Sequence, residues 1–121
     1  MRGLHPRHLM ADVHNVIIIG SGPAGYTAGL YAARGMLEPL MFAGYASGGQ
    51  LMLTSDIENF PGYPEGIMGP EMMEDLRKQA ERFGTDIRFG LITKVDFTKI
   101  PGEYHKLTID ESKEILARTV I

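Results

Sequence analysis

The sequence has 121 residues, with 12 lysine and arginine residues against 15 aspartate and glutamate residues, and its formal net charge is −3. This length allows one domain with a real core, and the mild acidity argues against nucleic-acid or anionic-membrane partners, which usually require a basic patch. The chain contains no cysteine, which excludes disulfides and thiol chemistry by its own residues, and no apolar run approaches the roughly 18 residues that cross a bilayer.

Residues 1–13 show no hydrophobic periodicity and precede the first regular element. Their basic character comes from Arg2, His5, Arg7 and His8. They lack the apolar region of a secretory signal. We therefore predict a flexible tail over residues 1–13, with a remnant transit peptide as the alternative.

Residues 16–43 predict a strand, a helix and a second strand. The β-branched run 16–19 is typical of a strand buried on both faces. Pro23 suits the first turn of a helix over 24–34, and Gly35 suits its C-terminal end. The apolar run 40–43 predicts the next strand. Such a βαβ unit has parallel strands and a right-handed crossover.

The remainder predicts a long loop, one helix and four strands. Residues 44–69 are rich in glycine but hold enough apolar side chains to argue against disorder. A helix is predicted to begin at Pro70 and to stop at Gly84. Acidic residues lie in its first turns and basic residues toward its end, in agreement with the helix dipole. Strands are predicted over 87–89, 91–97, 104–109 and 115–121.

The last residues form an apolar β-branched run, Thr119-Val120-Ile121. Domains usually end in a polar, frayed tail unless the last element docks. We therefore expect that the sequence is truncated, with a docked C-terminal strand as the alternative.

The motif G-x-G-x-x-G follows the first predicted strand and opens the first helix; it comprises Gly20, Ser21, Gly22, Pro23, Ala24 and Gly25. In this context the first glycine permits the tight turn, the second lets a pyrophosphate approach the backbone, and the third lets helix and strand pack closely. Free N–H groups at the helix start attract the phosphates. The motif therefore predicts a dinucleotide site, with a ligand-free turn as the alternative.

A ribose-binding acid is expected at the end of the second strand of such a site. Ala43 occupies that position, whereas Glu38 has nearly the right spacing but precedes the strand. We therefore interpret Glu38 as a solvated turn residue and expect backbone or solvent to hold the ribose.

Several segments together resemble one family. They are residues 17–28 (IIIGSGPAGYTA), 48–51 (GGQL), 57–62 (IENFPG), 77–84 (RKQAERFG) and 93–96 (TKVD). In this order and spacing they resemble the N-terminal segment of low-molecular-weight thioredoxin reductases, from about Asn15 to Ile121. The resemblance implies an α/β, Rossmann-like three-layer FAD-binding fold. Residues 14–121 would be the N-terminal part of an FAD-binding domain, cut before the NADPH domain.

The resemblance also implies FAD as the cofactor bound by this segment. The glycine turn would hold the FAD pyrophosphate, and residues 43–51 would line its adenosine and pyrophosphate side: Ala43, Gly44, Tyr45, Ala46, Ser47, Gly48, Gly49, Gln50 and Leu51. Asn59 would lie near the flavin, where a side-chain amide can both donate and accept hydrogen bonds. The backbone at Lys94 and Val95 would meet the adenine.

The resemblance implies that the full-length enzyme is an NADPH-dependent thioredoxin-disulfide reductase. It would be a cytoplasmic homodimer and would act on thioredoxin or a similar small redox protein. The sequence lacks the family's Cys-x-x-Cys pair and its NADPH glycine motif, so the 121-residue piece is expected to be inactive alone and to contain no catalytic or metal-ligating residue. Two alternatives stay open: a ferredoxin–NADP reductase or peroxide-reductase flavoprotein with the same segment, and a non-catalytic dinucleotide-binding or interaction remnant.

Overall fold

A computed structural model describes residues 13–121. The predicted tail therefore lies outside the described residues, apart from Val13. That residue is the first of strand β1 (Val13–Ile19), so the boundary predicted after residue 13 falls one residue too late.

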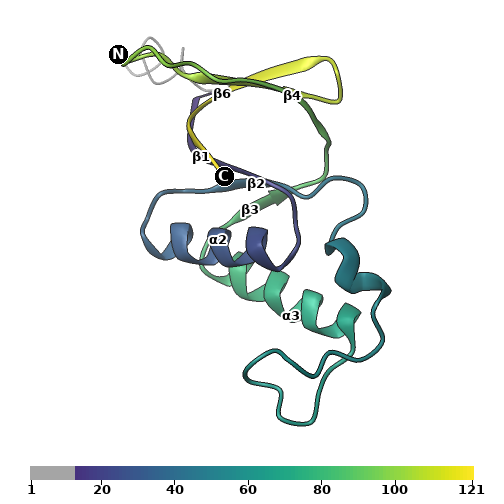
Figure 1. Cartoon of the computed structure of the whole chain (residues 1–121). Coiled ribbons are helices and arrows are strands. Elements are labelled where there is room, and N and C mark those ends of the chain that lie inside the picture. The colour runs from purple at the N-terminus through teal and green to yellow at the C-terminus, as the bar shows by residue number, and fades with distance from the viewer. Residues whose placement is uncertain (1–12) are drawn as a thin grey trace.

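Residues 13–121 form six strands, two α-helices and one 3₁₀-helix (Figure 1). After β1 come α2 (Pro23–Arg34), β2 (Leu40–Phe42), η1 (Gly49–Leu53), α3 (Gly69–Arg82), β3 (Asp86–Arg88), β4 (Ile92–Asp96), β5 (His105–Ile109) and β6 (Lys113–Val120). The predicted helices and strands are all present. The 3₁₀-helix η1 within the predicted loop was missed, because its five residues lack a helical period.

The strands form one sheet in the order β3-β2-β1-β6-β5-β4. The first four are parallel, with Ile17 opposite Leu40 in β2 and Val120 in β6. Strands β5 and β4 continue the sheet in antiparallel pairing. The parallel β1–α2–β2 unit confirms the predicted βαβ arrangement.

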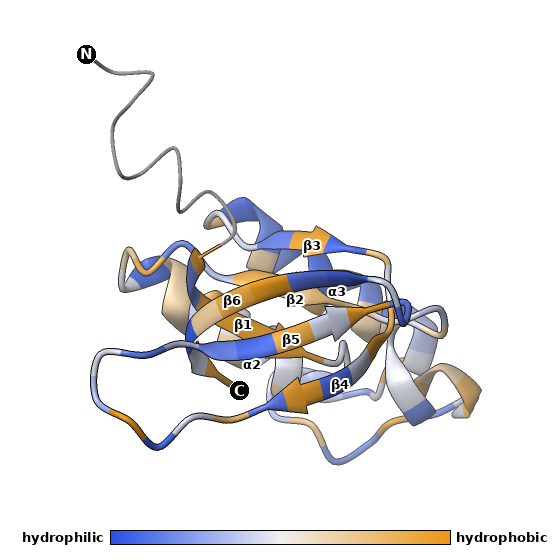
Figure 2. Ribbon diagram, turned by 90° about the horizontal axis from the view of Figure 1, so that it is seen from above, coloured by the Kyte–Doolittle hydropathy of each residue, from blue (hydrophilic) through white to orange (hydrophobic). Residues whose placement is uncertain are grey.

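The sheet curls over so that the molecule has three layers. Helices α2 and α3 lie against one side of the parallel strands, and β4, β5 and the start of β6 cover the other (Figure 1). In Figure 2 the β4–β6 layer lies in front of β1 and β2, with the helices behind them. The predicted α/β, Rossmann-like three-layer fold is confirmed.

Each interface between layers holds its own hydrophobic cluster. Val16, Ile18 and Met41 point toward the helices and pack with Met72 and Met73 of α3. The intervening residues of these strands, Ile17, Leu40 and Phe42, point the opposite way. They pack against Leu107 of β5 and against Ile115 and Ala117 of β6. Because side chains alternate along a strand, burial on both faces requires the continuous apolar runs seen in the sequence.

The predicted loop 44–69 is ordered by specific contacts. Ile57 and Ile67 form an antiparallel bridge, and the Tyr63 hydroxyl donates to Asp75 of α3 at 2.8 Å. The N–H of Gly69 donates to the Thr54 carbonyl at 3.0 Å, which joins η1 to the start of α3. Within residues 13–121, neither α-helix has the length and apolarity needed to cross a membrane.

Gly69→Ala should destabilise the fold, because a Cβ at this position would overlap the carbonyl oxygens of Leu51 and Thr54. We expect a loss of about 1–3 kcal/mol or more in the free energy of unfolding, measured by urea titration. Gly35→Ala is the matched control, since its added Cβ would meet only ordinary contacts from 3.4 Å outward. Equal stability of the two variants would contradict the close packing of η1 on α3.

Candidate functional site

The glycine turn begins where β1 ends, at Gly20. Its φ of +108° lies in the left-handed region that side-chain-bearing residues rarely adopt. The N–H of Gly20 donates to the Phe42 carbonyl at 2.9 Å, so the turn starts beside the end of β2. This placement agrees with the tight turn expected of the first glycine in the motif.

Helix α2 begins with its N-terminus open. Gly22 is the N-cap and has no side chain to accept from the first N–H groups, Pro23 follows, and the first turn contains no acidic residue. Apart from its immediate chain neighbours, no described residue has an atom within 4 Å of a Cβ built on Gly22. The unpaired N–H groups and the positive end of the helix dipole thus face open space that an anion can enter.

The third glycine of the motif sits against the first. A Cβ on Gly25 would overlap the carbonyl oxygen of Gly20. Only a residue without a side chain lets the first turn of α2 lie this close to the end of β1. Gly22 therefore leaves open space beside the turn, whereas Gly25 lets the helix pack closely against the end of the strand.

Ser21 ties the turn to the loop after β2. Its hydroxyl is buried, donates to the Ala43 carbonyl at 3.0 Å and accepts from the Gly48 N–H at 3.0 Å. Tyr26 lies behind it, 2% exposed, and burial raises the pKa of its phenol, an effect that the Ser21 hydroxyl partly opposes. The Ser21 side chain thus serves as a link within the protein.

A pocket of about 570 Å³ opens in front of the turn, within the usual range for small-ligand sites. Its floor is the glycine turn, and its walls follow β2 and β3. The lining residues are Ile19, Gly20, Ser21, Gly22, Phe42, Ala43, Gly44, Tyr45, Ala46, Gly49, Gly90, Leu91 and Ile92.

The structure thus brings eight of the predicted site residues together in this pocket: Gly20, Ser21, Gly22, Ala43, Gly44, Tyr45, Ala46 and Gly49. Ala43 lies directly after β2, where the sequence predicts the residue next to the ribose. Glu38 instead lines a separate cavity with Ala33 and Phe83, before β2 begins.

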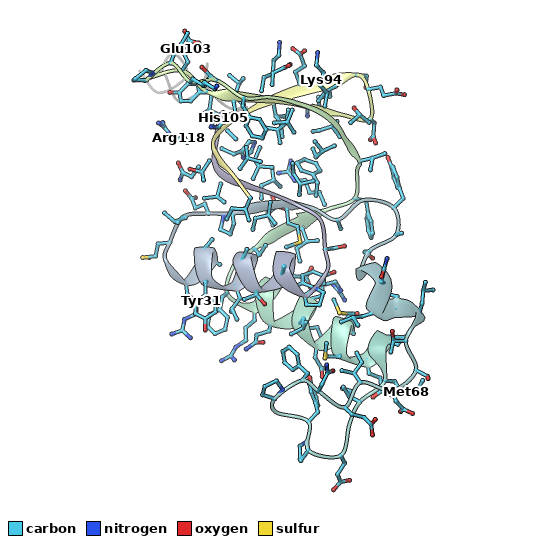
Figure 3. The ribbon with its side chains drawn as sticks, in the orientation of Figure 1. Tyr31, Met68, Lys94, Glu103, His105 and Arg118 are labelled. Atoms are coloured by element: carbon cyan, nitrogen blue, oxygen red, sulfur yellow. The ribbon has the colours of Figure 1, made fainter. Side chains whose placement is uncertain are left out.

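Other predicted residues lie outside the lining. Pro23, Ala24 and Gly25 form the first turn of α2; Gln50 and Leu51 lie in η1. Ser47 and Gly48 line a neighbouring cavity of about 60 Å³. Asn59 is exposed in the loop before α3. Lys94 is exposed on the outer layer (Figure 3). It pairs with Asp96, and Val95 packs into the second cluster.

Sequence reasoning missed the wall formed by Gly90, Leu91 and Ile92. Gly44 donates its N–H to the Gly90 carbonyl at 3.0 Å, which extends the pairing of β2 with β3 into the site. Carboxyl ends of neighbouring parallel strands meet at one edge of a sheet. Gly90 follows the predicted strand 87–89 directly, and this position could have indicated that residues 90–92 lie at the same edge of the sheet as the glycine turn.

Ser21→Ala should lower the free energy of unfolding by about 1–3 kcal/mol, because it leaves two buried backbone groups without their partner. Urea titration measures this loss, and the Gly48 amide should exchange faster with solvent. Thr27→Ala is the control: its hydroxyl also bonds a carbonyl, that of Pro23 at 2.7 Å, but it is exposed. Equal effects of the two substitutions would contradict the linking role of Ser21.

Gly25→Ala should destabilise the protein by about 1–3 kcal/mol or more, because α2 must move away from Gly20. Gly22→Ala should cost about 1 kcal/mol or less, since its φ is −79° and the added methyl group meets open space. Thermal or urea unfolding compares the two. A larger loss for Gly22→Ala would show that the turn is arranged differently.

Comparison with known proteins places this geometry in a family. The model of the pyridine nucleotide-disulphide oxidoreductase family matches residues 14–121. A thioredoxin reductase of Streptomyces clavuligerus is 59% identical over 90 residues, which make up 74% of this chain and 28% of that protein. Thioredoxin reductase 1, mitochondrial, of Arabidopsis thaliana is 53% identical over 117 residues, covering 91% of this chain and 30% of that protein.

Solved structures agree with the sequence comparisons. The crystal structure of a thioredoxin reductase from Streptococcus pyogenes superposes with a TM-score of 0.81 at 38% identity, covering 90% of this chain and 34% of that one. The chain therefore spans about a third of the length of the relatives that it matches. The resemblance to thioredoxin reductases is confirmed, and the chain belongs to the pyridine nucleotide-disulphide oxidoreductase family.

Proposed function

We propose that this chain supplies the FAD-binding part of an NADPH-dependent thioredoxin-disulfide reductase. The observation that carries the proposal is the open N-terminus of α2 above Gly22, at the floor of a pocket between the ends of β2 and β3. A pyrophosphate fits this position because the backbone N–H groups and the helix dipole favour an anion, and no side chain fills the space. FAD, when bound, supplies the transfer of electrons between a nicotinamide and a disulfide.

Within this proposal the chain's own residues bind and orient the cofactor. The turn from Gly20 to Gly25 holds the pyrophosphate, and residues 43–51 line the adenosine and pyrophosphate side. Asn59, Lys94 and Val95 remain proposals that rest on the resemblance alone, whereas Gly90, Leu91 and Ile92 have a position in the pocket that supports a cofactor contact. Ala43 at the end of β2 brings no carboxylate, so the ribose is left to backbone groups or solvent.

The reduction of a disulfide requires groups that this chain does not contain. Its 121 residues include no cysteine, and the redox-active dithiol must therefore come from elsewhere. By the same resemblance we assign NADPH binding, a homodimeric state, a cytoplasmic location and thioredoxin or a similar small protein as acceptor to the complete enzyme. The names of the relatives favour thioredoxin over ferredoxin as that acceptor.

Binding of FAD by the 121-residue chain tests the proposal, with quenching of flavin fluorescence as the measurement. The unaltered chain should bind FAD, and Gly22→Ala should weaken binding by about tenfold or more, because its methyl group occupies the space that the pyrophosphate approaches. The affinity of Thr27→Ala should equal that of the unaltered chain. A folded chain that does not bind FAD would favour the non-catalytic alternative.

The chain alone should show no NADPH-dependent reduction of a disulfide, because it contains no dithiol. Oxidation of NADPH at 340 nm in the presence of FAD and a disulfide substrate measures this. Turnover above the rate of free FAD would contradict the proposal that this chain binds the cofactor but does not itself reduce the disulfide.

A further inference from the structure

One carboxylate holds the two walls of the pocket together. Asp110 lies in the turn between β5 and β6, and its Oδ1 atom accepts two hydrogen bonds. One comes from the Tyr45 hydroxyl at 2.7 Å and the other from the Leu91 N–H at 3.0 Å. The Asp110 N–H in turn donates to the Leu91 carbonyl at 2.8 Å. We call the arrangement of Tyr45, Asp110 and Leu91 the Asp110 bridge.

The bridge joins segments that are far apart in the sequence. Tyr45 belongs to the wall that follows β2, and Leu91 belongs to the wall that follows β3. Tyr45 and Asp110 are separated by 65 positions. Nearer the floor, the Gly44–Gly90 backbone bond connects the same two walls. The bridge therefore adds a second connection that depends on side chains.

The turn that carries Asp110 is itself anchored. Asp110 and Glu111 have φ values of +50° and +61°, and the Glu111 N–H donates to the Thr93 hydroxyl of β4 at 3.1 Å. Aspartate and asparagine adopt this left-handed conformation more readily than other side-chain-bearing residues. The backbone thus holds the carboxylate at a fixed place beside the pocket.

The charge of Asp110 suits this role. The hydrogen bond from Tyr45 lowers the pKa of the Asp110 carboxyl, and the Leu91 N–H acts in the same direction. The same bond raises the pKa of the Tyr45 phenol. At neutral pH the carboxylate oxygen therefore accepts and the protonated phenol donates, which is the pairing seen in the bridge.

We propose that Asp110 is a positioning residue for the adenosine end of the dinucleotide, acting through Tyr45 and Leu91; this inference rests on the proposed FAD site. The glycine turn takes the pyrophosphate, and in such folds the nucleoside lies beyond the end of the second strand. Tyr45 and Leu91 flank that place. By holding both walls before the ligand arrives, the bridge reduces the ordering cost of binding.

Tyr45→Phe is the sharpest test, because it removes one hydroxyl from an exposed side chain. In the 121-residue chain we expect the dissociation constants for FAD and for ADP to rise about twofold to tenfold, the range of one hydrogen bond. The matched control is Tyr63→Phe, which removes another Tyr–Asp hydrogen bond, to Asp75 at 2.8 Å, away from the pocket. Its affinities should equal those of the unaltered chain.

A pair of substitutions at Asp110 separates the carboxylate from the backbone turn. Asp110→Gly tolerates the positive φ but lacks the acceptor, and it should weaken FAD and ADP binding at least as much as Tyr45→Phe. Asp110→Asn keeps an acceptor oxygen and should retain most of the affinity. In the free protein, the Leu91 amide should exchange with solvent about tenfold faster in Asp110→Gly than in Asp110→Asn.

The outcomes distinguish this inference from the proposed function. If the unaltered chain binds neither FAD nor ADP, the proposed function fails and the inference falls with it. If the unaltered chain binds both and Tyr45→Phe binds equally well, the inference alone is overturned. A merely structural bridge would lower the unfolding temperature of Asp110→Gly but leave the affinities unchanged at a temperature where every variant is folded, which also overturns it.

Discussion

The close approach of Gly25 to the Gly20 carbonyl fixes the geometry on which the candidate site depends. Because no side chain separates them, the first turn of α2 lies directly over the end of β1, and the open N-terminus of the helix faces the pocket. A side chain at Gly25 would move the helix outward and separate its N–H groups from the floor of the pocket. The open helix N-terminus that the proposed function assigns to an anion thus depends on a packing contact that involves no ligand.

The other parts of the pocket are held to this turn by polar contacts between distant segments. Ser21 joins the turn to the loop after β2, Gly44 pairs with Gly90, and Asp110 joins Tyr45 to Leu91. The pocket is therefore made mostly of backbone and small residues whose positions the sheet determines. Such a surface suits the binding and orientation of a large cofactor, which is what the proposed function requires of this chain.

The two sides of the parallel sheet explain how segments far apart in the sequence come to line one pocket. One face carries the helices that supply the turn, and the other carries the β4–β6 layer that supplies Asp110 and the segment before β4. Strand β6 connects the two parts, since it pairs with β1 on one side and with β5 on the other. The continuous apolar runs of β1 and β2 are required by this double burial.

The sequence by itself determined the β1–α2–β2 unit and the glycine turn, because strand and helix periods, Pro23 and the glycine spacing are local signals. It also determined the order of the remaining strands along the chain. Only the tertiary structure decided that β6 lies beside β1, that Gly90, Leu91 and Ile92 form a wall of the pocket, and that Asp110 reaches Tyr45. These features arise from pairing between segments many residues apart, and a local pattern does not encode the register of such pairing.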